Sequence, residues 1–169
     1  MSPVVIIVGP PGAGKTTLAA TLAAQLGVLA RDSDDDIEAT TGMTIADIFI
    51  EQGEQRFRDL ETEAIGLAIA EHDGVLSLGG GAVIRPESRD LLKPERVVFL
   101  DVGLAVAVKR VGMNANRPLL LGNVRSKLKA LMDERRPLYE EVATYTIVTD
   151  DLDADEVASR VLQCIGESS

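Results

Sequence analysis

A glycine-rich segment near the start of the chain has the residue types and spacing of a phosphate-binding loop. Residues 9–16 read Gly-Pro-Pro-Gly-Ala-Gly-Lys-Thr and match the pattern G-x-x-x-x-G-K-S/T, although a glycine turn that only caps a helix is the structural alternative. Glycines let successive backbone amides face a phosphate, and a helix that starts there adds partial positive charge. Lys15 can reach the β- and γ-phosphates, and the Thr16 hydroxyl can bind Mg²⁺. We therefore predict that a nucleotide is bound by Gly12, Ala13, Gly14, Lys15, Thr16 and Thr17.

Two aspartates stand where a second strand is expected to end, at the sheet edge that binds ligands in open α/β folds. Asp32 is suited to hold Mg²⁺ through its water shell. Asp34 is suited to orient a substrate hydroxyl and to accept its proton during phosphoryl transfer. The alternative is a solvated acidic run that caps a helix, which is how we interpret Asp35 and Asp36.

An arginine and a glycine run further along the chain could bind a second substrate. Arg58 shares a predicted helix face with Glu54 and Glu61, but this spacing is also typical of surface ion pairs that contribute little. Gly79, Gly80 and Gly81 follow a buried apolar run directly. They indicate either a ligand pressed against the backbone or a plain flexible turn.

Two later basic segments are further candidates. Residues 112–122 interrupt a helical pattern with glycine, asparagine and proline, and we predict a mobile lid there. Its Arg117 would swing onto the transferred phosphate and then release the product. Arg135 belongs to a second basic cluster at residues 135–139. Either arginine could instead be a solvated helix residue.

The hydrophobic pattern predicts the elements that position these residues. Short apolar runs that alternate with helical stretches predict a parallel sheet with strands near residues 4–8, 75–78, 97–100 and 146–148. A helix is predicted from Lys15 to Leu26, where leucines recur every four residues. Residues 34–71 are expected to be helical, with breaks near Gly42 and Gly53, and we assign them to an insertion that binds substrate.

Length, charge and composition exclude several classes of protein. A chain of 169 residues fits one domain, and its net charge of −10 argues against general binding to nucleic acid or to anionic membranes. No apolar run approaches membrane-spanning length, and the one cysteine, Cys164, cannot form an internal disulfide, so we expect a cytoplasmic protein. Cys164 is expected to be a buried structural residue, and His72 a solvated turn residue.

The order of motifs resembles the shikimate kinase family across nearly the whole chain: GPPGAGKT, DSD, GMTIADIF with GEQRFR, SLGGGAV, RPLL and RPLY. The resemblance implies an α/β fold of the nucleoside-monophosphate-kinase type, a P-loop three-layer sandwich with a five-stranded parallel sheet. Residues 1–169 would form one domain, with a substrate insertion at about 33–61 and a lid at about 112–122. The implied reaction converts ATP and shikimate, with Mg²⁺, into ADP and shikimate 3-phosphate, a step of aromatic amino-acid biosynthesis. We expect a monomer with no nucleic-acid or membrane partner.

The resemblance also implies residue roles. Asp34 would meet the ring hydroxyls, Arg58 and Arg135 the shikimate carboxylate, and the backbone of Gly79, Gly80 and Gly81 the ring. Arg135 rather than Arg136 is selected by counting back from Pro137 and Tyr139 in the pattern R-x-P-x-Y. Arg117 would bind ATP phosphates, and Arg110 would pack on adenine unless it is a helix-end surface residue. The residues with a catalytic role would be Lys15, Asp32, Asp34 and Arg117.

Two other functions remain open from sequence. The chain could be a kinase for another small polyol acid, such as gluconate, or for a nucleotide. It could also be a nucleotide-dependent regulatory protein that has lost turnover, although the retained Lys15, Thr16, Asp32, Asp34 and Arg117 argue against this. Arg31 is a departure, because a charged residue stands where the buried strand before Asp32 should continue.

Overall fold

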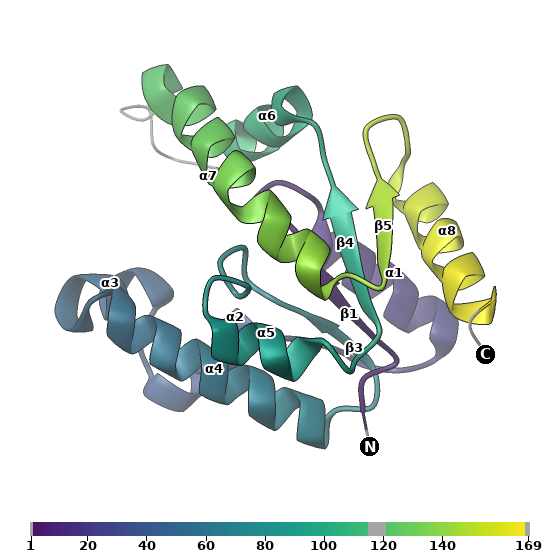
Figure 1. Ribbon diagram of the computed structural model, residues 1–169, viewed down its shortest axis with the longest axis horizontal. Helices are drawn as coiled ribbons and strands as arrows, with labels where there is room; N and C mark the ends of the chain where they lie inside the picture. Colours follow the sequence, from purple (N-terminus) through teal and green to yellow (C-terminus); the bar gives the residue numbers. More distant parts are fainter. Residues whose placement is uncertain (1, 115–120, 168–169) are drawn as a thin grey trace.

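The computed structural model describes residues 2–114 and 121–167. A five-stranded sheet with the order β2-β3-β1-β4-β5 forms the centre, and all neighbouring strands are parallel. Its strands are β1 (Val5–Val8), β2 (Ala30–Asp32), β3 (Val75–Ser77), β4 (Val97–Asp101) and β5 (Tyr145–Val148). The predicted five-stranded parallel sheet is thus confirmed, and Figure 1 shows helices on both of its faces.

Side chains of β1 alternate between the two faces of the sheet, so each face has its own hydrophobic core. The helices are α1 (Lys15–Leu26), α2 (Ser33–Thr41), α3 (Ile45–Gln52), α4 (Glu54–Glu71), α5 (Pro86–Leu92), α6 (Leu104–Asn114), α7 (Leu121–Val142) and α8 (Ala154–Glu167). Val5 and Ile7 pack in the core that α1 and α8 cover. Ile6 and Val8 pack on the other face, under α4, α5 and the last turns of α7. The three predicted layers, helix, sheet and helix, are therefore present.

The helices between β2 and β3 form a small unit with its own core. Ile37, Ile48, Phe57 and Ala64 come from α2, α3 and α4 and pack together. The chain turns between α2 and α3 at Gly42, whose φ of 69° is the left-handed conformation that glycine adopts without strain. The predicted helical segment and both of its breaks are confirmed. The second half of α4 packs on the sheet, beyond the predicted end of the insertion at residue 61.

The position of β2 at the edge of the sheet explains Arg31. An edge strand has a neighbour on one side only, and the three residues of β2 are exposed or half-buried, whereas β1 and β3 are buried throughout. The Nε atom of Arg31 donates to Asp36 at 2.7 Å, and its guanidinium also reaches Glu71 at 3.3 Å. The expectation that this strand is buried was wrong, because one strand's sequence does not reveal its place in the sheet.

The predictions for His72, Cys164 and the lid have three different outcomes. His72 is 9% exposed, and its Nε2 atom lies 3.1 Å from the carbonyl oxygens of both Leu29 and Val75, so the prediction of a solvated turn residue was wrong. Cys164 is half-buried against the core of the α1 and α8 face. The predicted lid overlaps the end of α6 and the start of α7, and Arg117 lies outside the described residues, so the lid stays a prediction.

Candidate active site

The phosphate-binding loop connects β1 to α1 at the carboxyl edge of the sheet, where the sequence predicted it. Gly12 has a φ of 82°, and a Cβ atom on it would lie 2.8 Å from the carbonyl oxygen of Ala107, so only glycine fits. The Nζ atom of Lys15 donates to the carbonyl oxygens of Gly9 at 2.8 Å and Pro10 at 3.0 Å. Burial lowers the pKa of Lys15 to about 8, although the nearby carboxylates of Asp34 and Asp32 oppose the shift.

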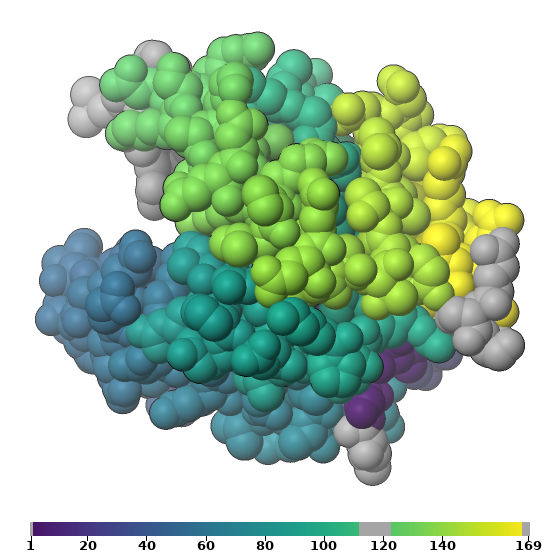
Figure 2. Space-filling model, in the orientation of Figure 1, coloured from purple at the N-terminus to yellow at the C-terminus, as the bar shows by residue number. Residues whose placement is uncertain are grey.

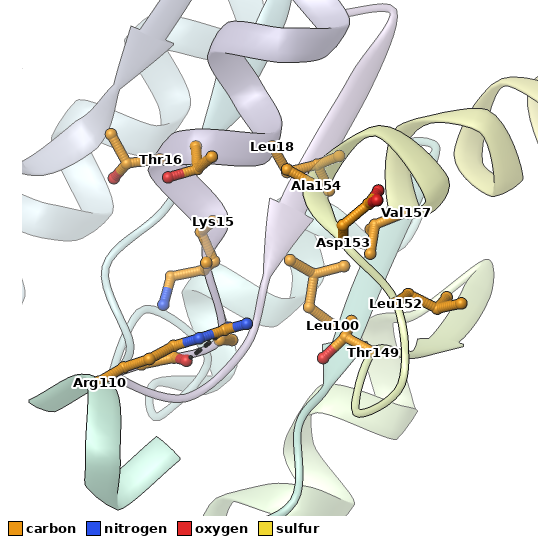
Figure 3. Close-up of a pocket in the computed structure, with 14 residues that line it drawn as sticks. Lys15, Thr16, Leu18, Leu100, Arg110, Thr149, Leu152, Asp153, Ala154 and Val157 are labelled. Atoms are coloured by element: carbon orange, nitrogen blue, oxygen red, sulfur yellow. Dashed lines mark hydrogen bonds between the residues drawn. The ribbon is translucent and has the colours of Figure 1, made fainter. Parts of the chain in front are cut away.

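A cavity of about 460 Å³ opens beside this loop. All predicted nucleotide-binding residues that the structure describes line it, namely Gly12, Ala13, Gly14, Lys15, Thr16, Thr17 and Arg110. The opposite wall comes from the β5–α8 connection, with Thr149, Leu152 and Asp153, as Figure 3 shows. Sequence analysis missed this wall, although loops at the carboxyl ends of parallel strands are the expected location of ligands.

The side chain of Arg110 packs against the phosphate-binding loop and does not lie at a solvated helix end. It extends from α6, is half-buried, and its Nη1 atom donates to the carbonyl oxygen of Gly12 at 3.0 Å. Its side chain is among those that line the cavity in Figure 3, and a Cβ atom on Gly14 of the same loop would lie 3.2 Å from its Nη1 atom. The surface alternative was therefore wrong, while stacking on adenine stays a prediction.

The two candidate aspartates differ in environment although they are two residues apart. The carboxylate of Asp32 accepts from the backbone amide of Asp34 at 2.8 Å and from the Ser77 hydroxyl at 2.9 Å, so it caps α2 and contacts β3. The Oδ1 atom of Asp34 is buried and has no hydrogen-bond partner among the described residues. Burial, together with the Asp32 charge, raises the pKa of Asp34 to about 6 against the opposing effect of Lys15.

Arg58 and Glu61 form a buried ion pair, so the predicted alternative of a surface ladder was wrong. Nη1 of Arg58 lies 2.8 Å from Oε1 of Glu61, and the two side chains are only 8% and 3% exposed. Glu54, the third residue of the predicted face, is exposed. The guanidinium lies 5.1 Å from the ring centroid of Phe57, and its Nε atom is buried without a partner in the described part of the chain.

The glycines after β3 are packed closely against these charged groups. A Cβ atom on Gly79 would lie 2.8 Å from Oδ1 of Asp34, and one on Gly81 would lie 2.6 Å from the guanidinium nitrogens of Arg58. A Cβ atom on Gly80 would lie 3.1 Å from Cδ of Pro11 in the phosphate-binding loop. Glycine therefore allows the charged side chains to approach the backbone, which a plain flexible turn does not require.

Arg135, and not its neighbour, belongs to this cluster. Its charge affects the pKa values of Lys15, Glu61 and Tyr139. Arg136 instead forms two hydrogen bonds with the carboxylate of Asp101, at 2.8 and 2.6 Å. We call Asp34, Arg58, Gly79–Gly81, Glu61 and Arg135 the acceptor cluster.

The acceptor cluster is assembled from distant parts of the chain. Arg58 comes from α4 and Arg135 from α7, and Figure 2 shows the surface hollowed between the insertion helices and α7. Sequence analysis missed Glu61 and Tyr139 as parts of the site. Their signals were present: Glu61 lies three residues from Arg58, and Tyr139 was used only to number the arginine.

Comparison with known proteins decides the family. The family model described as shikimate kinase matches residues 11–166. The chain belongs to the shikimate kinase family. A shikimate kinase from Saccharopolyspora erythraea is 51% identical over 164 residues, which cover 96% of this chain and 94% of the relative. One from Salinispora arenicola is 52% identical over 161 residues, which cover 95% of this chain and 96% of the relative.

Solved structures of the family have the same fold. Shikimate kinase from Acinetobacter baumannii in complex with shikimate aligns with a TM-score of 0.92 and 40% identity, covering all of this chain and 95% of the other. Shikimate kinase from Aquifex aeolicus aligns with a TM-score of 0.85 and 27% identity, covering 97% and 96%. The predicted shikimate kinase is thus confirmed, and the chain is an ATP-dependent kinase, a transferase. No helix in residues 2–114 or 121–167 is both long and apolar enough to cross a membrane.

Proposed function

We propose that the chain binds ATP in the 460 Å³ cavity and shikimate in the acceptor cluster, and transfers the γ-phosphoryl group to the 3-hydroxyl. The observation that carries this proposal is the position of Lys15. It lines the nucleotide cavity, and its pKa responds to Asp34 and Arg135 of the acceptor cluster. One cation therefore acts on both sites, as transfer between two bound substrates requires.

The shikimate carboxylate would bind between Arg58 and Arg135. A planar guanidinium can hold a carboxylate through two hydrogen bonds, which fixes the ring in one orientation. The Nε atom of Arg58, which has no partner among the described residues, offers a donor for this purpose, because Glu61 accepts from Nη1 of the same guanidinium. Orientation of this kind lowers the barrier by holding the hydroxyl close to the γ-phosphate.

The shikimate 3-hydroxyl would be held by Asp34. Its buried, unpartnered Oδ1 atom can accept a hydrogen bond from an alcohol. With a pKa of about 6, Asp34 is mostly ionised at neutral pH, and it is a stronger proton acceptor than an ordinary aspartate. As the bond between the 3-hydroxyl oxygen and the γ-phosphorus forms, the bond from that phosphorus to the β,γ-bridging oxygen would break and ADP would leave. The hydroxyl proton would pass to the Asp34 carboxylate, while Lys15 offsets charge on the phosphoryl oxygens.

Mg²⁺ fits the residues at the phosphate-binding loop. The described residues hold no group of three or more His, Cys, Asp or Glu that could bind a metal alone. Mg²⁺ is usually held by one or two protein ligands together with phosphates and waters, so such a group is not needed. The exposed Thr16 hydroxyl would bind the ion directly, and Asp32, which accepts one hydrogen bond on each oxygen, would bind it through water. When bound, Mg²⁺ neutralises charge on the β- and γ-phosphates.

The remaining predictions belong to the same proposal. Residues 112–122 would act as a lid that brings Arg117 to the ATP phosphates, and residues 33–61 as the insertion that binds shikimate. The chain would work as a monomer in the cytoplasm.

The test is ADP formation from MgATP with shikimate, gluconate or a nucleoside monophosphate, by the wild-type protein and Asp34→Asn. We expect turnover with shikimate alone, and a loss of about 10²- to 10⁴-fold in kcat for the variant, which removes a charged proton acceptor. Asp35→Asn is the matched control, because Asp35 is exposed and next in sequence. Preferential use of another acceptor, or equal activity of the two variants, would contradict the proposal.

A further inference from the structure

Tyr139 joins three elements that surround the acceptor cluster. It lies near the end of α7, is 1% exposed, and its ring stacks on Phe99 of β4 with 5.0 Å between centroids. Its hydroxyl donates to the carbonyl oxygen of Gly80 at 2.5 Å. Arg135 lies one helical turn earlier on α7, and its charge near this hydroxyl opposes the rise in the pKa of Tyr139 that burial causes.

We propose that Tyr139 is a positioning residue, which orients the Gly80–Gly81 peptide and Arg135 for binding the shikimate carboxylate and ring. This inference rests on the proposed function of the acceptor cluster. In a planar trans peptide the carbonyl and the following amide point in opposite directions. Holding the Gly80 oxygen at Tyr139 therefore directs the amide of Gly81 away from α7, and Gly81 is the glycine packed against Arg58.

The hydroxyl of Tyr139 is a permanent donor. Burial raises the pKa of Tyr139 to about 12, although Arg135 and Arg58 oppose the shift, so the proton stays on the oxygen across the working range of pH. The hydrogen bond to the Gly80 carbonyl is therefore independent of pH in that range, and the stack on Phe99 holds the ring in place. The rigid sheet is in this way connected to a glycine segment that has no side chains of its own to fix it.

Tyr139→Phe tests the inference, because it removes the hydroxyl and keeps the ring and its stack. Tyr145→Phe is the matched control, since Tyr145 is the only other tyrosine and packs half-buried against the core of the opposite face. The measurements are kcat, the KM values for shikimate and ATP, the Kd for shikimate by calorimetry, and the melting temperature.

We expect Tyr139→Phe to raise the Kd and KM for shikimate about tenfold, which corresponds to about 1.4 kcal/mol. The KM for ATP should change less than about twofold, and Tyr145→Phe should change neither. A lower melting temperature with unchanged shikimate affinity, or an equal loss of affinity for both substrates, would overturn the inference while wild-type turnover stands. A wild-type protein that does not phosphorylate shikimate would overturn the proposed function, and this inference with it.

Discussion

Replacing Arg58 by alanine should affect both the stability that the buried Arg58–Glu61 pair provides and the shikimate binding proposed for Arg58. The side chains are 8% and 3% exposed, so Arg58→Ala leaves Glu61 without its partner in a site that water hardly reaches. Removing one member of such a pair costs about 3–5 kcal/mol, because the remaining charge is buried and unpaired. Loss of the charged hydrogen bond that we propose between Arg58 and the shikimate carboxylate would cost about 1.5–3 kcal/mol, or roughly tenfold to a hundredfold in Kd.

The loss of stability should depend on pH with a defined sign. Burial already raises the pKa of Glu61, and the hydrogen bond from Arg58 opposes that shift, so Arg58→Ala raises the folded-state pKa further. A carboxyl group with a raised folded-state pKa destabilises little below its unfolded pKa, where it is protonated in both states. Its cost grows as the pH rises toward the folded-state value. Urea unfolding should therefore show a larger deficit at pH 8 than at pH 5.

A double variant keeps stability and binding distinguishable. Replacing both members of a buried ion pair by apolar residues of similar size is often neutral for stability. Arg58→Met combined with Glu61→Met should therefore unfold near the wild-type urea concentration and still bind shikimate weakly, with ATP affinity nearly unchanged. Arg56→Ala, an exposed arginine on the same helix, serves as the control. Wild-type shikimate affinity in the stable double variant would refute the reasoning, because it would leave Arg58 with a structural role only.

Two further predictions concern the phosphate-binding loop and its pH dependence. The value of kcat/KM for shikimate should fall as the pH decreases through about 6, where Asp34 takes up a proton. It should also fall as the pH increases through about 8, where Lys15 loses a proton. A flat profile between pH 5 and 9 would contradict these roles. Gly12→Ala should lower stability by about 2 kcal/mol or more and the melting temperature by about 4–8 °C, because φ is 82° and the new Cβ would meet the Ala107 backbone. Gly66→Ala, in the middle of α4, should cost nothing, because the new Cβ would lie in ordinary contact, 3.8 Å from Cδ1 of Leu91. Equal melting temperatures for the two variants would refute the argument.

The features that sequence predicted well are those fixed by local chemistry. The helix at Lys15–Leu26 has the predicted bounds, because glycine precedes and follows a run of good helix formers. The buried strands β1, β3 and β4 were found within one residue of their ends, since β-branched runs between turn residues have few alternatives. The phosphate-binding loop was predictable because its function resides in the backbone of contiguous residues.

What sequence left open depends on contacts between distant segments. The spacing of Arg58 and Glu61 is the same for an exposed pair and a buried one. The pair is buried through contacts with other segments, such as Gly81 after β3, which packs against the Arg58 guanidinium. His72 was predicted to be a solvated turn residue because its sequence neighbours are typical of a turn. Its hydrogen-bond partners are the carbonyl oxygens of Leu29 and Val75, at the start of two neighbouring strands, and their closeness to His72 cannot be seen in the sequence. Burial of a polar residue is a property of the assembled sheet.

An acidic chain can bind two anionic substrates because net charge and local charge are separate quantities. The net charge is −10, yet Lys15, Arg110 and Arg135 form no salt bridge among the residues described, and they gather around the two sites. Other arginines, such as Arg89 and Arg136, are neutralised at the surface by Glu141 and Asp101. These three cations are half-buried, so their charges are screened less by water, whereas the fields of exposed acidic groups are screened within about 8–10 Å. The acidic surface therefore disfavours polyanions such as nucleic acid, while the small anions that enter the cleft meet cations that form no salt bridge among the residues described.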